Sequence, residues 1–261
     1  MISSVANARV KQVVQWQAKA KERRKAKVFL AEGIKMFQEA PQKSIVEVYV
    51  SEAQLPALER TEQVWNKLRQ VGFETVSEEV FAKMSDTQTP QGILTVLHQS
   101  EYQLEQLVNE HNPLLVVLEN LQDPGNLGTI IRTGEGAGIT GVIMSKQTVD
   151  IYNPKVIRAT MGSIYRVPFV YVEDLQETLE LLHQKGIHTY AAHLQGETYY
   201  DSFSFKEPTA FLIGNEGNGL SREIADCARQ YLKIPMEGQV ESLNAAIATA
   251  LLMYEAHRQR G

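Results

Sequence analysis

The sequence has one cysteine and no long apolar run, and these two absences exclude whole classes of protein. Cys227 cannot form a disulfide within the chain or join a cysteine cluster that binds metal, and its helical surroundings predict a packed thiol. No apolar run approaches the roughly 18 residues that a membrane-spanning helix needs. Residues 1–12 lack the apolar stretch and the cleavage site of a secretory signal. We therefore expect a cytoplasmic protein without a membrane partner.

Intact motifs for metals and for nucleotide phosphates are also missing. The six histidines show no metal-ligand spacing such as H-E-x-x-H, so no metal is expected. The letters G-x-G-x-x-G occur at 136–141, but they follow a helical stretch and precede a strand, which is the wrong context for a dinucleotide. The loop 214-GNEGNGLS-221 departs from a phosphate loop because Leu220 replaces the lysine and Glu216 would repel phosphate. A dehydrogenase or a nucleotide hydrolase is disfavoured, and the loop suits a neutral or cationic ligand.

The net charge of the chain is −5, but the charges are unevenly distributed. Residues 1–30 carry eight basic residues and a single acidic one, Glu22. A basic arm on an acidic body suits a polyanionic partner, because each phosphate that it neutralises releases counterions. A solvated helix face explains the same run of charge equally well, so the charge alone leaves both interpretations open.

Alternating helix and strand patterns predict two α/β domains joined by a linker. Residues 1–98 indicate a basic helix at 6–27 followed by a small α/β domain, and the polar segment 99–112 is the candidate linker. Residues 113–261 indicate a second α/β domain, whose continuous apolar runs are typical of strands buried on both faces of a mainly parallel sheet. These runs are 114–120, 141–145, 188–194, 209–214 and 231–235.

Two helices of the second domain have recognisable boundaries. Asp174 is a candidate N-cap for a helix that ends before Gly186. The last helix is expected to start from Ser242, a natural N-cap. This helix is expected to carry an apolar stripe at helical spacing, which consists of Leu243, Ala246, Ile247, Ala250, Leu251 and Tyr254.

Polar residues gather in three loops that leave the carboxyl ends of predicted strands, where open α/β sheets place their ligand crevices. The first loop leads to Asn126 and Arg132, the second holds Glu216, and the third holds Ser242 and Asn244. Each has a structural explanation by itself: a cap for Ser242, a turn for Asn126, or an ion pair between Arg132 and Glu216. Their combination at one edge of a sheet favours a shared functional site.

Together these three loops closely resemble the motifs of the SpoU, or TrmH-like, family of RNA ribose 2′-O-methyltransferases. The pattern N-x-G-x-x-x-R matches 126–132, G-x-E-G-x-G-[LI]-[SP] matches 214–221, and I-P-M-x-G-x-x-x-S-L-N matches 234–244. The run at 3–11 and the stretch AEGIKMFQEA at 31–40 also resemble the small RNA-binding domain of the family. The resemblance covers nearly the whole chain and is more specific in the catalytic half.

The resemblance implies a fold, a cofactor and the residues that hold it. The implied fold is α/β, a mainly parallel sheet flanked by helices with a C-terminal trefoil knot as in the SPOUT superfamily, plus the small N-terminal α/β domain. The implied cofactor is S-adenosylmethionine, a sulfonium cation without phosphates, and no metal is implied. Main-chain groups would hold it, and the implied cofactor contacts are Gly214, Ile234, Met236 and Leu243, together with Ala192 and His193.

The implied reaction is in-line transfer of a methyl group to a ribose 2′-oxygen, which requires aligned reactants and loss of the hydroxyl proton. The resemblance implies that Arg132 binds the target phosphate and acts as the base. A guanidinium is almost never deprotonated in proteins, so stabilising the developing alkoxide is the easier role for it. Asn126, Ser242 and Asn244 would position Arg132 and the nucleotide. Glu216 would orient Arg132 through charge-assisted hydrogen bonds.

RNA is the implied partner, and ribosomal RNA is favoured over transfer RNA because a separate N-terminal domain resembles the rRNA-modifying branches of the family. A homodimer through the methyltransferase domain is also implied. A non-catalytic RNA-binding protein of the same fold is the main alternative, and the intact polar motif positions disfavour it. The expected RNA contacts are Arg9, Lys11, Arg23, Arg24 and Arg132.

Overall fold

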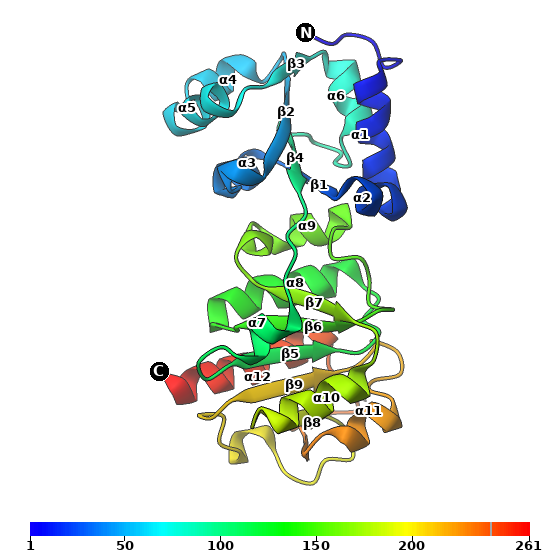
Figure 1. Cartoon of the computed structure of the whole chain (residues 1–261), viewed down its shortest axis with the longest axis vertical. Coiled ribbons are helices and arrows are strands. Elements are labelled where there is room, and N and C mark those ends of the chain that lie inside the picture. Colours follow the sequence, from blue (N-terminus) through cyan, green and yellow to red (C-terminus); the bar gives the residue numbers. More distant parts are fainter. Residues whose placement is uncertain (241) are drawn as a thin grey trace. The chain divides into compact units, whose positions relative to one another are not determined.

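The computed structural model describes residues 1–240 and 242–261, which form two compact units (Figure 1). The first unit contains Met1–Ser100 and Asp150–Tyr165, and the second contains Glu101–Val149 and Arg166–Gly261. The domain boundaries expected at 98 and 113 stay predictions. The contacts add that residues 150–165, which lie within the second domain in sequence, pack with the N-terminal residues.

The first unit is built on a four-stranded sheet with the order β1-β4-β2-β3, in which only β2 and β3 pair in parallel. Helices α1 and α6 cover one face of this sheet and α3, α4 and α5 cover the other. The elements are α1 (Ala8–Ala18), α2 (Ala20–Ala26), β1 (Val28–Glu32), α3 (Ile34–Glu39), η1 (Gln42–Ser44), β2 (Ile45–Ser51), α4 (Leu55–Glu59), α5 (Glu62–Val71), β3 (Glu74–Val76), α6 (Glu78–Met84), β4 (Ile93–His98), α9 (Pro154–Thr160) and η2 (Ser163–Tyr165).

The basic helix expected over 6–27 is two helices, because the backbone of Lys19 is extended between α1 and α2. The side chain of Asn7 caps α1 by accepting a 2.9 Å hydrogen bond from the N–H of Arg9. The apolar side of α1 buries Val10, Val13 and Trp16 against the sheet. Hydrophobic burial of three large side chains on so short a helix accounts for its docking.

The second unit confirms the expected α/β fold with a parallel sheet. Its six strands lie in the order β10-β8-β9-β5-β6-β7, and every neighbouring pair is parallel. The elements are α7 (Leu104–Val108), β5 (Leu114–Leu118), α8 (Pro124–Ala137), β6 (Gly141–Ser145), β7 (Phe169–Val172), α10 (Leu175–Gln184), β8 (His188–Ala192), η3 (Tyr200–Ser202), β9 (Thr209–Ile213), α11 (Arg222–Cys227), β10 (Gln230–Leu232) and α12 (Ala245–Arg260). The trefoil knot stays a prediction.

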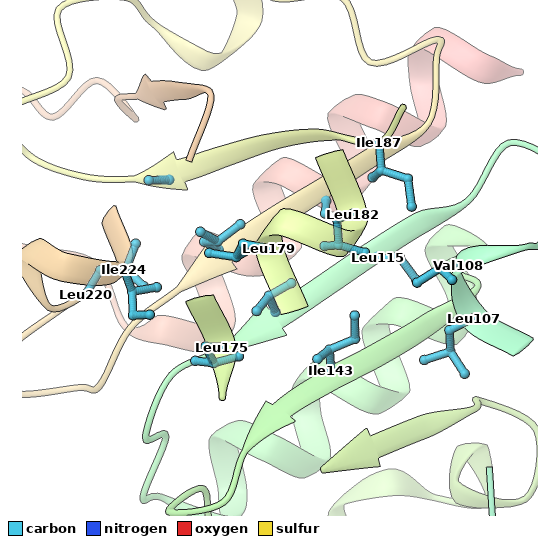
Figure 2. Packing of buried hydrophobic residues seen from close by; sticks show 14 of the residues in the cluster. Leu107, Val108, Leu115, Ile143, Leu175, Leu179, Leu182, Ile187, Leu220 and Ile224 are labelled. Carbon is cyan, nitrogen blue, oxygen red and sulfur yellow. The ribbon is translucent and has the colours of Figure 1, made fainter. Parts of the chain in front are cut away.

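Side chains on the strands alternate between two helical layers. Leu115, Ile143 and their neighbours pack against the leucines of α10, which lie directly over the strands in Figure 2. Helices α7 and α11 extend the same layer, and α8 and α12 pack against the opposite face. Asp174 caps α10 as expected, accepting hydrogen bonds from the N–H groups of Gln176 and Glu177 at 2.7 and 3.1 Å.

Strand β7 is not among the strands that were expected from the sequence. It is short and lies at the edge of the sheet, where Tyr171 is exposed, although its four residues, FVYV, are all apolar. In the part of the chain that the structure describes, no helix is long and apolar enough to cross a membrane.

The expected start of the last helix was wrong, and most of the expected apolar stripe does not lie on its buried side. The N-cap of α12 is Asn244, whose side-chain oxygen accepts hydrogen bonds from the N–H groups of Ala246 and Ile247. Apolar residues occupy most positions around α12, so helical spacing by itself does not select one face. Three members of the expected stripe are 38–53% exposed: Ile247, Leu251 and Tyr254. The side of α12 that is buried consists of Ala245, Ala246, Thr249, Leu252, Met253 and Ala256.

Candidate functional site

Parallel pairing brings the loops that follow the central strands to one edge of the second sheet. Strand β5 is paired with β9 from Leu114↔Thr209 to Leu118↔Ile213, so the loop before α8 and the loop 214–221 leave the sheet side by side. Strand β8 lies on the other side of β9 and is followed by His193. This is the edge at which an open α/β sheet holds its ligand.

A cavity of about 400 Å³ lies among these loops. All six residues that the resemblance implied as cofactor contacts line it: Ala192, His193, Gly214, Ile234, Met236 and Leu243. Glu216 and Ser242 line it as well, whereas Asn126, Arg132 and Asn244 are not part of its lining. Asn215 and Lys233 also belong to the wall, although neither was expected from the sequence as a cofactor contact. The expected site residues thus divide into those that line the cavity and those that do not.

The loop 214–221 folds back so tightly that glycine is required. A Cβ atom on Gly214 would lie 2.0 Å from the carbonyl carbon of Gly219 and from the nitrogen of Leu220. Asn215 and Gly219 exchange backbone hydrogen bonds of 3.0 and 2.8 Å, and Gly219 has a φ of +68°. Leu220, at the position where a phosphate loop has lysine, is 6% exposed and belongs to the core beneath α11. Packing therefore explains this leucine.

Glu216 is the acceptor that ties the loop 214–221 to the start of α8. Its carboxylate accepts hydrogen bonds from the backbone N–H groups of Gln122 at 3.0 Å and Asp123 at 2.9 Å. It also accepts one from Asn126 Nδ2 at 3.1 Å. Asn126 Oδ1 in turn accepts a 2.9 Å hydrogen bond from Asn244 Nδ2. One connected network therefore joins the three motif loops.

Arg132 stands apart from this network. It lies on α8 and is exposed, and its side chain makes no hydrogen bond or ion pair to any residue that the structure describes. The sequence expectation placed Glu216 against Arg132, but the hydrogen bonds of Glu216 go to Gln122, Asp123 and Asn126. The guanidinium is consequently available to a group outside the chain.

The ring of His193 is held at the rim of the cavity. Its Nδ1 accepts a hydrogen bond from the N–H of Gln195 at 3.2 Å, and the ring lies 5.0 Å from that of Tyr231. The N–H of His193 donates to the carbonyl of Leu232 at 3.0 Å. Across residues 1–240 and 242–261, no group of three or more His, Cys, Asp or Glu side chains is placed to hold a metal ion.

The expected RNA contacts in the first unit differ in their availability. Lys11 and Arg24 are exposed, and Arg9 is 44% exposed beside Glu47 and Glu74, at 3.6 and 3.9 Å. Arg23 is only 3% exposed, because it donates hydrogen bonds to the carbonyl of Trp16 at 2.7 Å and to Asp150 at 2.5 Å. Arg23 is therefore part of the packing of the first unit and is not presented to RNA.

The electrostatics of Glu216 favour a permanent carboxylate. Partial burial raises its pKa, but the hydrogen bonds from Gln122, Asn126 and Asp123 outweigh burial and hold the pKa below the ordinary value of 4.5. A carboxyl group with a depressed pKa stabilises the folded chain at pH values above its unfolded pKa, and this stabilisation is lost as the pH falls through the folded pKa.

We predict that Glu216→Gln lowers the thermal stability of the second unit by a constant amount from neutral pH down to the ordinary pKa of 4.5. Below that pH the difference from the wild type should shrink, because a proton binds first to this carboxyl group in the unfolded wild-type chain and then, at still lower pH, to the same group in the folded chain. Melting temperatures of both proteins against pH measure this. Glu197→Gln, which removes an exposed carboxylate of the same unit, is the control and should match the wild type. A difference that grows below this pH would contradict the assignment.

Two sequence-family models and a relative of known activity match the chain. The sequence model of the SpoU rRNA methylase family matches residues 113–254, and that of an MRM3-like substrate-binding domain matches residues 7–95. The 23S rRNA (guanosine(2553)-2′-O)-methyltransferase RlmP of Bacillus subtilis is 34% identical over 257 residues, which cover 97% of each chain.

Solved structures of similar proteins include the cofactor. An AdoMet-bound rRNA methyltransferase from Sinorhizobium meliloti is 30% identical, with a TM-score of 0.85 over 98% of this chain and 97% of that one. The SpoU methyltransferase AviRb from Streptomyces viridochromogenes, in complex with AdoMet, is 26% identical, with a TM-score of 0.86 over 97% of this chain and 98% of that one. The fold, the three motif loops and these matches agree, and the chain belongs to the SpoU rRNA methylase family.

Proposed function

We propose that this protein transfers the methyl group of S-adenosylmethionine to a ribose 2′-hydroxyl of ribosomal RNA. The observation that carries the proposal is the cavity at the strand ends, which all six implied cofactor contacts line. Ribosomal RNA is preferred over transfer RNA because RlmP, whose name specifies 23S rRNA, is similar over 97% of the chain. The expected cytoplasmic location belongs with this proposal, because ribosomal RNA is found there.

The cavity has the properties that S-adenosylmethionine requires. A volume of about 400 Å³ lies within the range of small-molecule sites. The wall at Gly214 is backbone, since no Cβ fits there, and the Glu216 carboxylate at the rim suits a positively charged ligand. The bound cofactor would supply an activated methyl group on its sulfonium. The residues that would hold it are Ala192, His193, Gly214, Ile234, Met236 and Leu243.

Arg132 is the residue that would act on the RNA. Its exposed guanidinium carries a permanent charge and has no partner in the described chain, so it can bind a phosphate and stabilise the charge that develops on the 2′-oxygen. A deprotonated guanidinium is not required for either task. Asn126 and Asn244 are joined by a hydrogen bond at the amino end of α8, the helix that carries Arg132, and Ser242 lies at the cavity wall where the nucleotide would approach.

The first unit would bind the RNA outside the reaction centre. Lys11 and Arg24 are exposed on α1 and α2, and Arg9, also on α1, has part of its charge balanced by Glu47. Phosphate contacts of this kind position a substrate without reading its sequence. The substrate-binding-domain match over residues 7–95 supports this division of labour.

A homodimer through the methyltransferase domain is part of the proposal. Three large apolar side chains of α12, namely Ile247, Leu251 and Tyr254, are 38–53% exposed and line a groove together with Tyr200. Water contact with a continuous apolar face is unfavourable, and a second copy of the same face would cover it in a symmetric pair.

We predict that the wild-type protein incorporates label from methyl-labelled S-adenosylmethionine into ribosomal RNA taken from a strain lacking the gene. Digestion of that RNA should release 2′-O-methyl nucleotides, and mapping should place them at a defined position. RNA already modified in the wild-type strain is the control and should accept little label. Methylation of transfer RNA alone would overturn the ribosomal assignment. Binding of RNA without any methyl transfer would favour the non-catalytic alternative.

Arg132→Ala should reduce methyl transfer by at least about a hundredfold, the scale of a lost electrostatic stabiliser, while cofactor affinity stays within about twofold. The cofactor affinity is retained because Arg132 does not line the cavity. Single-turnover methylation and calorimetric titration with S-adenosylmethionine measure the two quantities. Arg222→Ala, which removes a 94% exposed arginine of α11, should leave both unchanged. Lost cofactor binding together with intact turnover would contradict this role for Arg132.

Leu251→Asp should convert a dimeric wild type into a monomer, because it places a charge on the apolar face of α12. Sedimentation equilibrium at micromolar concentration measures the mass. Val5→Asp, which changes a 40% exposed apolar residue of the first unit, should leave the dimer intact. The dimer proposal is overturned if the wild type is monomeric or if Leu251→Asp remains dimeric.

A further inference from the structure

A polar cluster centred on Asn120, which follows β5, is hydrogen-bonded to the loop 214–221. Asn120 has a φ of +54°, in the left-handed region that asparagine, aspartate and glycine adopt most easily. Its neighbours Ser145 and Thr148 are 6% and 5% exposed, so their hydroxyl groups depend on partners within the chain. None of these three residues belongs to the motifs or to the cavity wall.

Ser145, the last residue of β6, holds Asn120 by two hydrogen bonds. The N–H of Asn120 donates to Ser145 Oγ at 2.8 Å, and Ser145 Oγ donates to Asn120 Oδ1 at 2.8 Å. Thr148 Oγ1 lies 3.1 Å from the same Ser145 oxygen. The backbone and the side chain of Asn120 are thereby tied to the neighbouring strand.

The backbone carbonyl of Asn120 connects this arrangement to the loop 214–221 at the cavity wall. It accepts a hydrogen bond from Asn215 Nδ2 at 2.9 Å and a second one from Gln122 Nε2 at 3.0 Å. Asn215 Oδ1 accepts hydrogen bonds from the N–H groups of Gly217 at 2.9 Å and Asn218 at 3.3 Å. The amide of Asn215 is thus held at both ends. Its orientation decides where the turn that lines the cavity lies.

We propose that Asn120, anchored by Ser145, is a positioning residue for the cofactor site: through the Asn215 amide it sets the turn 215–219 at the cavity wall. The inference rests on the proposed function, since it concerns the same cavity. Asn120 would contact neither S-adenosylmethionine nor RNA, and it would act only through Asn215.

The side chain and the backbone of Asn120 can be tested separately. Asn120→Asp keeps an oxygen that accepts from Ser145 and tolerates the positive φ, so it should preserve the arrangement. Asn120→Gly also keeps the backbone conformation but removes the acceptor, and Ser145→Ala removes the other partner. Thr178→Val is a matched control, because it removes a buried hydroxyl hydrogen bond of 2.6 Å to Asp174 elsewhere in the same unit.

The experiment is calorimetric titration of each full-length protein with S-adenosylmethionine, combined with hydrogen exchange of the free proteins. We expect Asn120→Gly and Ser145→Ala to weaken cofactor binding about tenfold and to speed exchange of the Gly219 N–H, which donates to Asn215. Asn120→Asp should bind within about twofold of the wild type. Thr178→Val should bind normally even if its melting temperature falls.

Wild-type affinity in Asn120→Gly and Ser145→Ala, or an equal loss in Thr178→Val, would overturn the inference and leave the proposed function standing. Weakened cofactor binding by a normally folded Asn120→Asp protein would also overturn the inference and leave the proposed function standing. Absence of S-adenosylmethionine binding by the wild type itself would overturn the proposed function instead. The two failures are therefore distinguishable within one set of titrations.

Discussion

The parallel pairing of β5 with β9 is the constraint on which the site depends. The register Leu118↔Ile213 ends both strands at the same level, so the loops that follow are neighbours although about 90 residues separate them in sequence. Glu216 can then reach the N–H groups of Gln122 and Asp123 at the entrance of α8. Without that pairing, the three motif loops would share no common edge and no cavity.

Electrostatics at the entrance of α8 strengthen the same arrangement. The amino end of a helix carries partial positive charge and unpaired N–H groups, and a carboxylate placed there is stabilised. Asp123 caps the helix through the N–H of Asn126, and Glu216 accepts from the turn just before it. The lowered pKa of Glu216 follows from these donors. The carboxylate is therefore a structural acceptor as well as a charge at the cavity rim.

Much of the fold and site could be predicted from the sequence because its signals are local. Continuous apolar runs predicted the central strands, Asp174 predicted the start of α10, and the spacing of polar residues after strands predicted the three loops. The six residues that the resemblance implied as cofactor contacts line one cavity. The short edge strand β7 was not predicted although its four residues are all apolar, because so short an apolar run does not by itself distinguish a strand from a buried helical segment.

The sequence by itself determined most of the strands of the second sheet, the order of the motifs and the kind of ligand that its loops suit, since each depends on a few adjacent residues. Only the tertiary structure decided which face of α12 is buried, that Arg23 pairs with Asp150 and is not presented to RNA, and that Glu216 bonds to the entrance of α8. Each of these outcomes depends on a partner far away in the chain. Hydrogen bonds and burial select such partners only after the sheet has brought them together.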